Sequence, residues 1–84
     1  MDVKIDVVLD SGKRMSIEVE TDMYAYEIPD RLIEEGALNP PPSGKIYELF
    51  FKERDHQKLD MDATLEENDV RENDTLMIHE SGVA

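Results

Sequence analysis

Two stretches of alternating apolar and polar residues open the chain and strongly limit what it can fold into. Apolar side chains occupy every second position in both: Val3, Ile5, Val7 and Leu9, then Met15, Ile17 and Val19. Alternation with a period of two is typical of a half-buried strand. Between the stretches lies a turn sequence, Asp10-Ser11-Gly12-Lys13, in which Gly12 can adopt a positive φ. We therefore expect an antiparallel hairpin with one apolar face, which another element must cover.

The covering element is a helix predicted between about residues 25 and 35. Four apolar residues fall on one helical face: Tyr24, Ile28, Leu32 and Ile33. Thr21 and Asp22 are residue types that cap helix N-termini, and Gly36 is typical of a helix end. Pro29 is compatible with a helix that begins around Ala25, because it then lies in or just after the first turn, where a missing amide costs little.

The second half of the chain predicts two strands and two shorter elements. The strands are expected at Ile46–Lys52 and Thr75–His79, with a short return strand ending at Leu59 and a single helical turn over Thr64–Asn68. Between helix and strand, the segment 39–44 holds three consecutive prolines. We interpret it as a stiff connector, the alternative being a docking ligand for a proline-binding module.

Composition restricts the function. The chain has 84 residues, enough for one small domain, and no cysteine, which excludes disulfides and thiolate chemistry. Its 21 acidic and 9 basic residues give a net charge of −12, which disfavours nucleic acid and anionic lipid as partners. The charge favours a basic protein partner, or serves solubility alone. No apolar segment has the length of a signal sequence or a membrane span, so we expect a cytoplasmic protein.

The predicted order is hairpin, helix, strand, short strand, helical turn and final strand. Apolar and threonine residues of the second half follow a recognisable spacing: Leu59, Thr64-Leu65, Val70 and Thr75-Leu76. Glu35-Gly36 is followed shortly by prolines. In these features the chain resembles the ubiquitin-like superfamily over about residues 3–79, which implies an α+β fold of the β-grasp type. We expect a ubiquitin-like domain over residues 1–79 and a flexible tail over 80–84.

Two further patterns narrow the resemblance. Ile28-Pro29-x-x-Leu32 and Leu65-x-x-x-x-Val70-x-x-x-Asp74-x-Leu76 are similar to small bacterial ubiquitin-like proteins associated with type VII secretion, and to relatives in ubiquitin-like conjugation operons. One hypothesis is a protein modifier, conjugated through Gly82 after removal of Val83-Ala84, with an activating or conjugating enzyme and a processing protease as partners. The other is a noncovalent accessory protein that binds a secretion component. An ordinary frayed end explains Gly82 equally well.

The resemblance implies neither catalysis nor a cofactor, and the residues agree. His56 and His79 are the only histidines, and their spacing suggests no metal pair. Asp60, Asp62 and Thr64 begin like a calcium loop, but the sixth and twelfth positions lack the required Gly and Glu. No glycine-rich phosphate loop is present. We expect a protein without enzymatic activity.

Strand alternation assigns the two faces of the sheet. The residues expected in the core are Val3, Ile5, Val7, Met15, Ile17, Val19, Ile28, Leu32, Leu49, Phe51, Leu65, Val70, Leu76 and Ile78. The open face is expected to present Val8, Phe50, Met77 and His79, and the resemblance implies that partners bind there. The alternative is a strand phase shifted by one, with Phe50 inside. A basic edge is also predicted, formed by Lys52, Arg54, His56 and Lys58. Either this edge orients a partner, or the segment is only a solvated turn.

Overall fold

The alternating segments at the start of the chain form the expected hairpin. In the computed structural model, which describes residues 1–82, β1 spans Asp2–Val8 and β2 spans Arg14–Glu20. The strands are antiparallel, with Val3 opposite Val19 and Val7 opposite Met15. Gly12 has a φ of +89° in the connecting turn. Gly12 therefore adopts the positive φ expected of a glycine in this turn.

The helix lies where the apolar pattern places it, although it begins later than its proposed cap. α1 spans Glu27–Glu34, and Pro29 is in its first turn. Thr21 and Asp22 do not cap it: the N-cap is Tyr26, without a side-chain hydrogen bond. Tyr24 pairs with Thr64 in an isolated β-bridge, so the chain remains non-helical up to that point.

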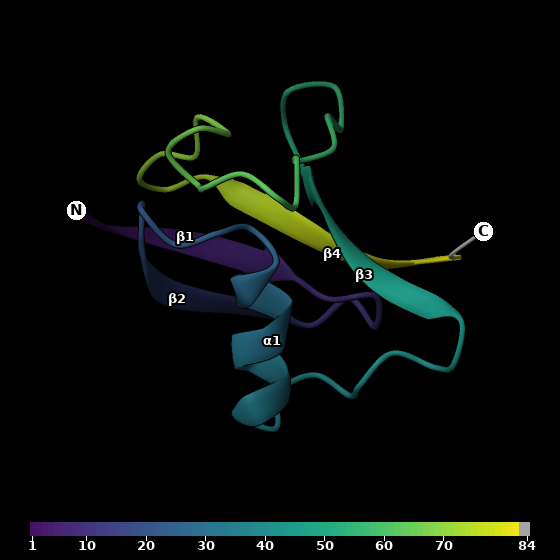
Figure 1. Ribbon diagram of the computed structural model, residues 1–84. Helices are drawn as coiled ribbons and strands as arrows, with labels where there is room; N and C mark the ends of the chain where they lie inside the picture. The colour runs from purple at the N-terminus through teal and green to yellow at the C-terminus, as the bar shows by residue number, and fades with distance from the viewer. Residues whose placement is uncertain (83–84) are drawn as a thin grey trace.

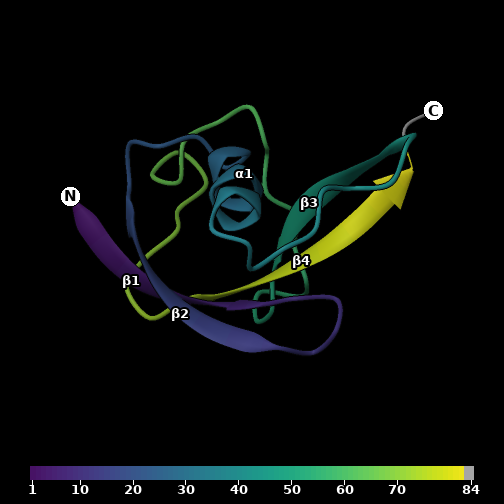
Figure 2. The same ribbon diagram turned by 90° about the horizontal axis from the view of Figure 1, so that it is seen from below.

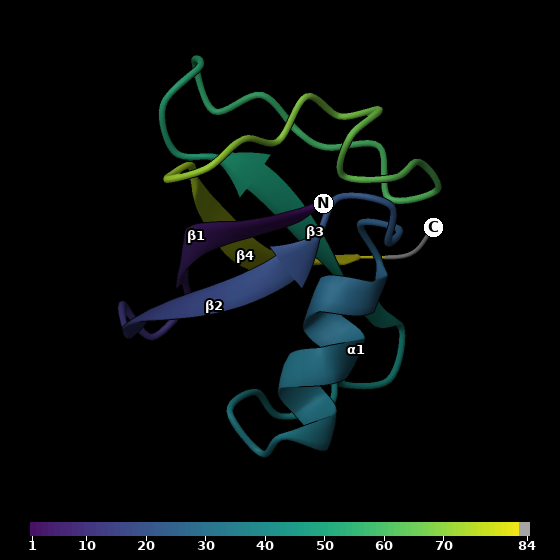
Figure 3. The ribbon, with the colours of Figure 1, turned by 90° about the vertical axis from the view of Figure 1, so that its left-hand side faces the viewer.

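Four strands form one mixed sheet in the order β2-β1-β4-β3 (Figures 1 and 3). β3 spans Lys45–Phe51 and β4 spans Thr75–Gly82. β4 is parallel to β1, with Val8 opposite Met77, and antiparallel to β3, with Phe50 opposite the same Met77. The first and last strands of the domain are thus its two inner strands, as the β-grasp prediction requires.

The last strand continues past the boundary expected after His79. β4 reaches Gly82, which lies opposite Lys45 at the start of β3, and Glu80 lies opposite Tyr47. The physical reason is the length of β3, whose first residues offer backbone partners to residues 80–82. These residues are paired strand and not a free tail. Val83-Ala84, whose removal the modifier hypothesis requires, lies outside the described residues.

Of the two short elements predicted, the return strand differs from its prediction and the helical turn is present. The return strand before Leu59 is reduced to one β-bridge between Lys58 and Phe50, supported by a hydrogen bond of 2.9 Å from the Leu59 amide to the Leu49 carbonyl. The helical turn after Thr64 closes with a hydrogen bond of 3.0 Å from the Asn68 amide to the Thr64 carbonyl, and the Thr64 hydroxyl accepts one of 3.0 Å from the Glu67 amide, as expected of a cap residue. Neither segment is long enough to form a regular element.

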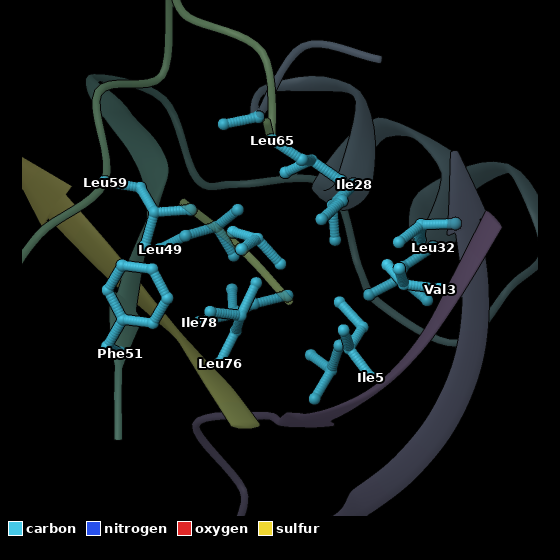
Figure 4. Close-up of a cluster of buried hydrophobic side chains, with 14 of the residues drawn as sticks. Val3, Ile5, Ile28, Leu32, Leu49, Phe51, Leu59, Leu65, Leu76 and Ile78 are labelled. Carbon is cyan, nitrogen blue, oxygen red and sulfur yellow. The ribbon is translucent and has the colours of Figure 1, made fainter. Parts of the chain in front are cut away.

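The helix covers the concave face of the curved sheet, and the core fills the space between them (Figures 2 and 4). Figure 4 shows Ile5, Leu76 and Ile78 of the sheet directed toward Ile28 and Leu32 of α1. The predicted core residues are buried, apart from Met15 and Ile17, which are half-buried. Those two lie on β2, which is an edge strand and therefore less completely covered.

Candidate functional site: the open face of the sheet

The four residues predicted for the open face occupy neighbouring positions on three strands. Met77 of β4 lies between Val8 of β1 and Phe50 of β3 in the sheet register. His79 follows on the same side of β4, and its ring centroid is 5.7 Å from that of Phe50. The sheet therefore gathers the four side chains into one patch, which we call the open-face patch.

The exposure of the paired phenylalanines establishes the strand phase. Phe51 is 4% exposed and belongs to the core, whereas Phe50 is half-buried on the opposite face. Val8 and Met77 are also half-buried, and His79 is exposed. The alternative phase, with Phe50 inside, is wrong. Half-buried apolar side chains on a sheet face without a covering element can be buried further by a partner.

One side of the open-face patch is bordered by a carboxylate that is already neutralised. Asp6 accepts a hydrogen bond of 2.6 Å from the Ser16 hydroxyl and one of 2.8 Å from the Arg14 guanidinium. These two donors hold the pKa of Asp6 below its ordinary value, the Ser16 hydroxyl having the larger effect. Arg14 also reaches the Thr75 hydroxyl at 3.4 Å, so it spans from β2 toward β4.

The other side of the patch carries two more internal pairs. Glu48, only 8% exposed, lies 2.5 Å from the Lys58 ammonium. Hydrogen bonds from Lys58 and then Ser81 lower the pKa of Glu48, although its partial burial acts in the opposite direction. His79 pairs through Nδ1 with Asp10 at 2.5 Å, which fixes the imidazole beside Phe50. Sequence reasoning missed these pairs because Asp10 and Lys58 lie in connecting segments with no periodic signal.

The predicted basic edge is not a free cluster of positive charge. Its members were Lys52, Arg54, His56 and Lys58. Arg54 lies 2.8 Å from Asp74 and places its guanidinium 4.2 Å from the centre of the Phe51 ring. Lys58 is engaged by Glu48. The segment is a turn in which Arg54, Asp55 and His56 all have positive φ, and Arg54 and Lys58 tie it to acidic residues elsewhere in the domain.

Gly82, the residue proposed for conjugation, lies at the end of β4, away from the open-face patch. It is exposed, and a Cβ added there would meet nothing within 4 Å. It is nonetheless opposite Lys45 in the β3–β4 register. Its backbone is therefore accessible but held in the sheet.

The described residues contain no group of three or more His, Asp or Glu side chains placed to hold a metal ion. No helix in this part of the chain is long and apolar enough to cross a membrane. What the open face offers chemically is an apolar centre bordered by neutralised charges, which suits contact with another protein surface.

Comparisons with solved structures identify the fold. A de novo design based on ubiquitin has a TM-score of 0.75 and 19% identity, over 99% of this chain and 93% of the design. The UBL domain of Plasmodium falciparum Dsk2 has a TM-score of 0.73 and 17% identity, over 96% of this chain and all of that domain. No protein-family model matches the chain, and no curated protein matches its sequence.

The fold is thus that of a ubiquitin-like β-grasp domain, as the resemblance predicted. Both structural neighbours span nearly the whole of this chain, so the likeness covers sheet and helix together. At sequence identities of 19% and 17%, the likeness to these two structures shows the fold alone. The narrower comparison with bacterial secretion-associated proteins and conjugation-operon modifiers rests on the sequence patterns.

Proposed function

We propose that the chain is a noncovalent protein-binding domain without enzymatic activity, which recognises its partner through the open-face patch. The observation that supports this most directly is the register, which places Val8, Met77 and Phe50 side by side, with His79 adjoining. The three apolar side chains are half-buried on a face that the helix does not cover. They form an apolar centre of the kind on which protein interfaces are built.

The charges around the patch favour a partner that makes mainly apolar contact. Asp6 and Glu48 are paired with Arg14 and Lys58 of the same domain, and Asp10 contacts the His79 imidazole. A partner therefore does not need to neutralise a buried carboxylate when it covers Phe50 and Met77, and the cost of removing water from the rim is small. We infer a protein partner, and the sequence resemblance to secretion-associated proteins implies a secretion component.

The test is the binding of Phe50→Ala and Met77→Ala to the protein encoded beside this one, measured by calorimetry. Each truncation should weaken binding by about 1–2 kcal/mol, or roughly 5- to 30-fold. The melting temperature should change little, since both side chains are only half-buried. Tyr24→Ala is a matched control, because Tyr24 is 43% exposed and lies outside the patch.

Two results would count against this function. Unchanged affinity in both variants would remove the open-face patch from the interface. Equal weakening by Tyr24→Ala would show that the effect is not specific to this face. Both results can be interpreted only if the Phe50→Ala variant is folded, which its amide spectrum verifies.

The second candidate is a modifier conjugated through Gly82. The exposure of this glycine, and the empty space around it, support access by an enzyme. The pairing with Lys45 argues for an extra step, because the end of β4 must leave β3 before its backbone can enter an enzyme channel. Intact-mass spectrometry beside its neighbouring gene products tests this: loss of Val83-Ala84, and adducts absent in Gly82→Glu, would support it. A chain that keeps its full mass beside active enzymes would exclude it.

A further inference from the structure

Two grooves run along the helix on the side of the molecule away from the open-face patch. Tyr26, the N-cap of α1, and Asp30, in the first turn of the helix, line both of them. One groove lies between α1 and β2, and the other between α1 and the beginning of β3. The two residues therefore form a ridge from which a bound segment can reach both sides.

The groove toward β3 is mostly apolar. Its volume is about 330 Å³, and its walls include Pro29, Ile33, Ile46 and Met61. Ile46 is 47% exposed and Tyr26 is 45% exposed, which makes them two of the most exposed large apolar residues of the domain. The volume is at the lower end of ligand pockets, about 300–1,000 Å³, and suits one or two side chains of a protein segment.

The groove toward β2 is strongly acidic. Its walls carry six carboxylates and one guanidinium: Asp2, Glu18, Glu20, Glu27, Asp30, Glu34 and Arg31. Within residues 1–82, none of these carboxylates takes part in an ion pair, and Arg31 donates instead to the backbone carbonyl of Glu18. This differs from Asp6 and Glu48 on the open face, which are paired with Arg14 and Lys58. Glu27 accepts a hydrogen bond of 2.7 Å from the Tyr24 amide. The charge of the other carboxylates is left for an external cation.

We propose that this helix-side surface is a second docking site, and that its occupant is a basic protein segment with an apolar anchor. The anchor enters the groove between α1 and β3, covering Ile33 and Met61. Lysine or arginine side chains on either side of the anchor cross the Tyr26–Asp30 ridge and face the carboxylates of the β2 side. Charge complementarity selects this occupant, because an acidic or neutral segment would leave the unpaired carboxylates uncompensated.

The experiment is selection of a random displayed-peptide library on the intact protein, followed by mapping of the selected peptides. The peptides should carry Lys or Arg around a Leu, Ile, Met or aromatic residue. Synthetic copies, titrated into isotope-labelled protein, should shift the amide signals of α1 and of the start of β3. Their affinity should fall about tenfold as NaCl rises from about 50 to 200 mM, because exposed charges are screened.

Variants separate this surface from the open face. Ile33→Ser, on α1, should weaken the selected peptide at least about tenfold, and Asp30→Asn with Glu34→Gln should reduce its salt dependence. Phe50→Ala, on the other face, should leave its affinity within about twofold. The amide spectrum of each variant shows whether it is folded. The map of shifted signals is measured on the unaltered protein, so it remains a test even if a variant does not fold.

Three outcomes would overturn the proposal. One is a library that yields only acidic or neutral peptides, or none. Another is a shift map centred on Phe50 and Met77. The last is a peptide that loses affinity with Phe50→Ala and not with Ile33→Ser. The last two would leave the open-face function standing, so failure here is distinguishable from failure of that function.

Discussion

At the scale of single residues, position within a strand decides what chemically identical side chains do. Phe50 and Phe51 are adjacent, yet one lies on the open face beside His79 and the other in the core under Arg54. The pleat alone separates them, because successive side chains of a strand point to opposite faces. Substitutions at neighbouring positions should therefore affect binding and stability separately.

Leu76→Ala should be among the most destabilising substitutions in the domain. Leu76 is fully buried between the sheet and the helix, and removing its branched end leaves a cavity that costs about 2–5 kcal/mol. Glu66→Ala is the control: its side chain is exposed, so the change should stay within about 0.5 kcal/mol. Urea denaturation measures both, and equal midpoints would contradict the assigned core.

Glu48→Gln should reveal a pH-dependent contribution to stability. The folded-state pKa of Glu48 lies below the ordinary value of 4.5, so folding favours its charged form. This contribution is fully present above pH 4.5 and is lost as pH falls through the folded pKa. The difference in unfolding free energy between wild type and Glu48→Gln should thus be largest near pH 6 and vanish in strong acid.

Denaturation at several pH values checks this expectation. Lys58→Gln provides a second measure, because it removes the hydrogen-bond donor that contributes most to the lowered pKa. A difference between wild type and Glu48→Gln that grows as the pH falls would have the wrong sign and would exclude the ion pair as its source.

At the scale of elements, regular periodicity was predictable and short connecting structure was not. The hairpin and α1 follow from repeating apolar positions, whose burial requires several residues in register. The segment before Leu59 has no such repeat, and a single bridge to Phe50 decides its conformation. The end of β4 was missed for a related reason: polar residues 80–82 are held by backbone pairing with β3, to which side-chain patterns give no clue.

The same distinction applies to the candidate site. Strand alternation was enough to place Val8, Phe50, Met77 and His79 on one face, and the strand order from the family resemblance brought them together. The ion pairs around them depend on Asp10 and Lys58, which approach through turns. Their positions follow from the tertiary structure.

The end of α1 provides a prediction about backbone conformation. Gly36 has a φ of +77°, and its amide donates to the Ile33 carbonyl at 3.1 Å. Gly36→Ala should cost about 1–2 kcal/mol, because an L-residue is strained in this region. Gly82→Ala is the matched control, since Gly82 has no positive φ and empty space around it. Thermal unfolding compares them, and equal losses would show that the strain at Gly36 does not matter.

At the scale of the whole molecule, the charge is large and unevenly compensated. The 21 acidic residues outnumber the 9 basic ones, and the grooves beside α1 hold several of the unpaired acids. Like charges in a folded chain repel one another and lower its stability. Acids retained at such a cost are consistent with a role in binding.

Salt should therefore stabilise the domain. Raising NaCl from about 10 to 200 mM should increase the melting temperature by a few degrees, because screening reduces the repulsion. Glu18→Gln combined with Glu34→Gln should raise the melting temperature in low salt and shrink the salt effect. Asp6→Asn should lower it, since Asp6 is paired with Arg14. Calorimetry in a salt series measures this, and a melting temperature that falls with salt would contradict it.

The parallel pairing of β1 with β4 joins the two ends of the domain at the middle of the sheet. During synthesis on the ribosome, β4 emerges last, although Leu76 and Ile78 supply the centre of the core. Until then β1 has one unpaired side, and the hairpin and helix have no complete surface to pack against. The nascent domain therefore cannot complete its sheet and core until β4 has left the exit tunnel.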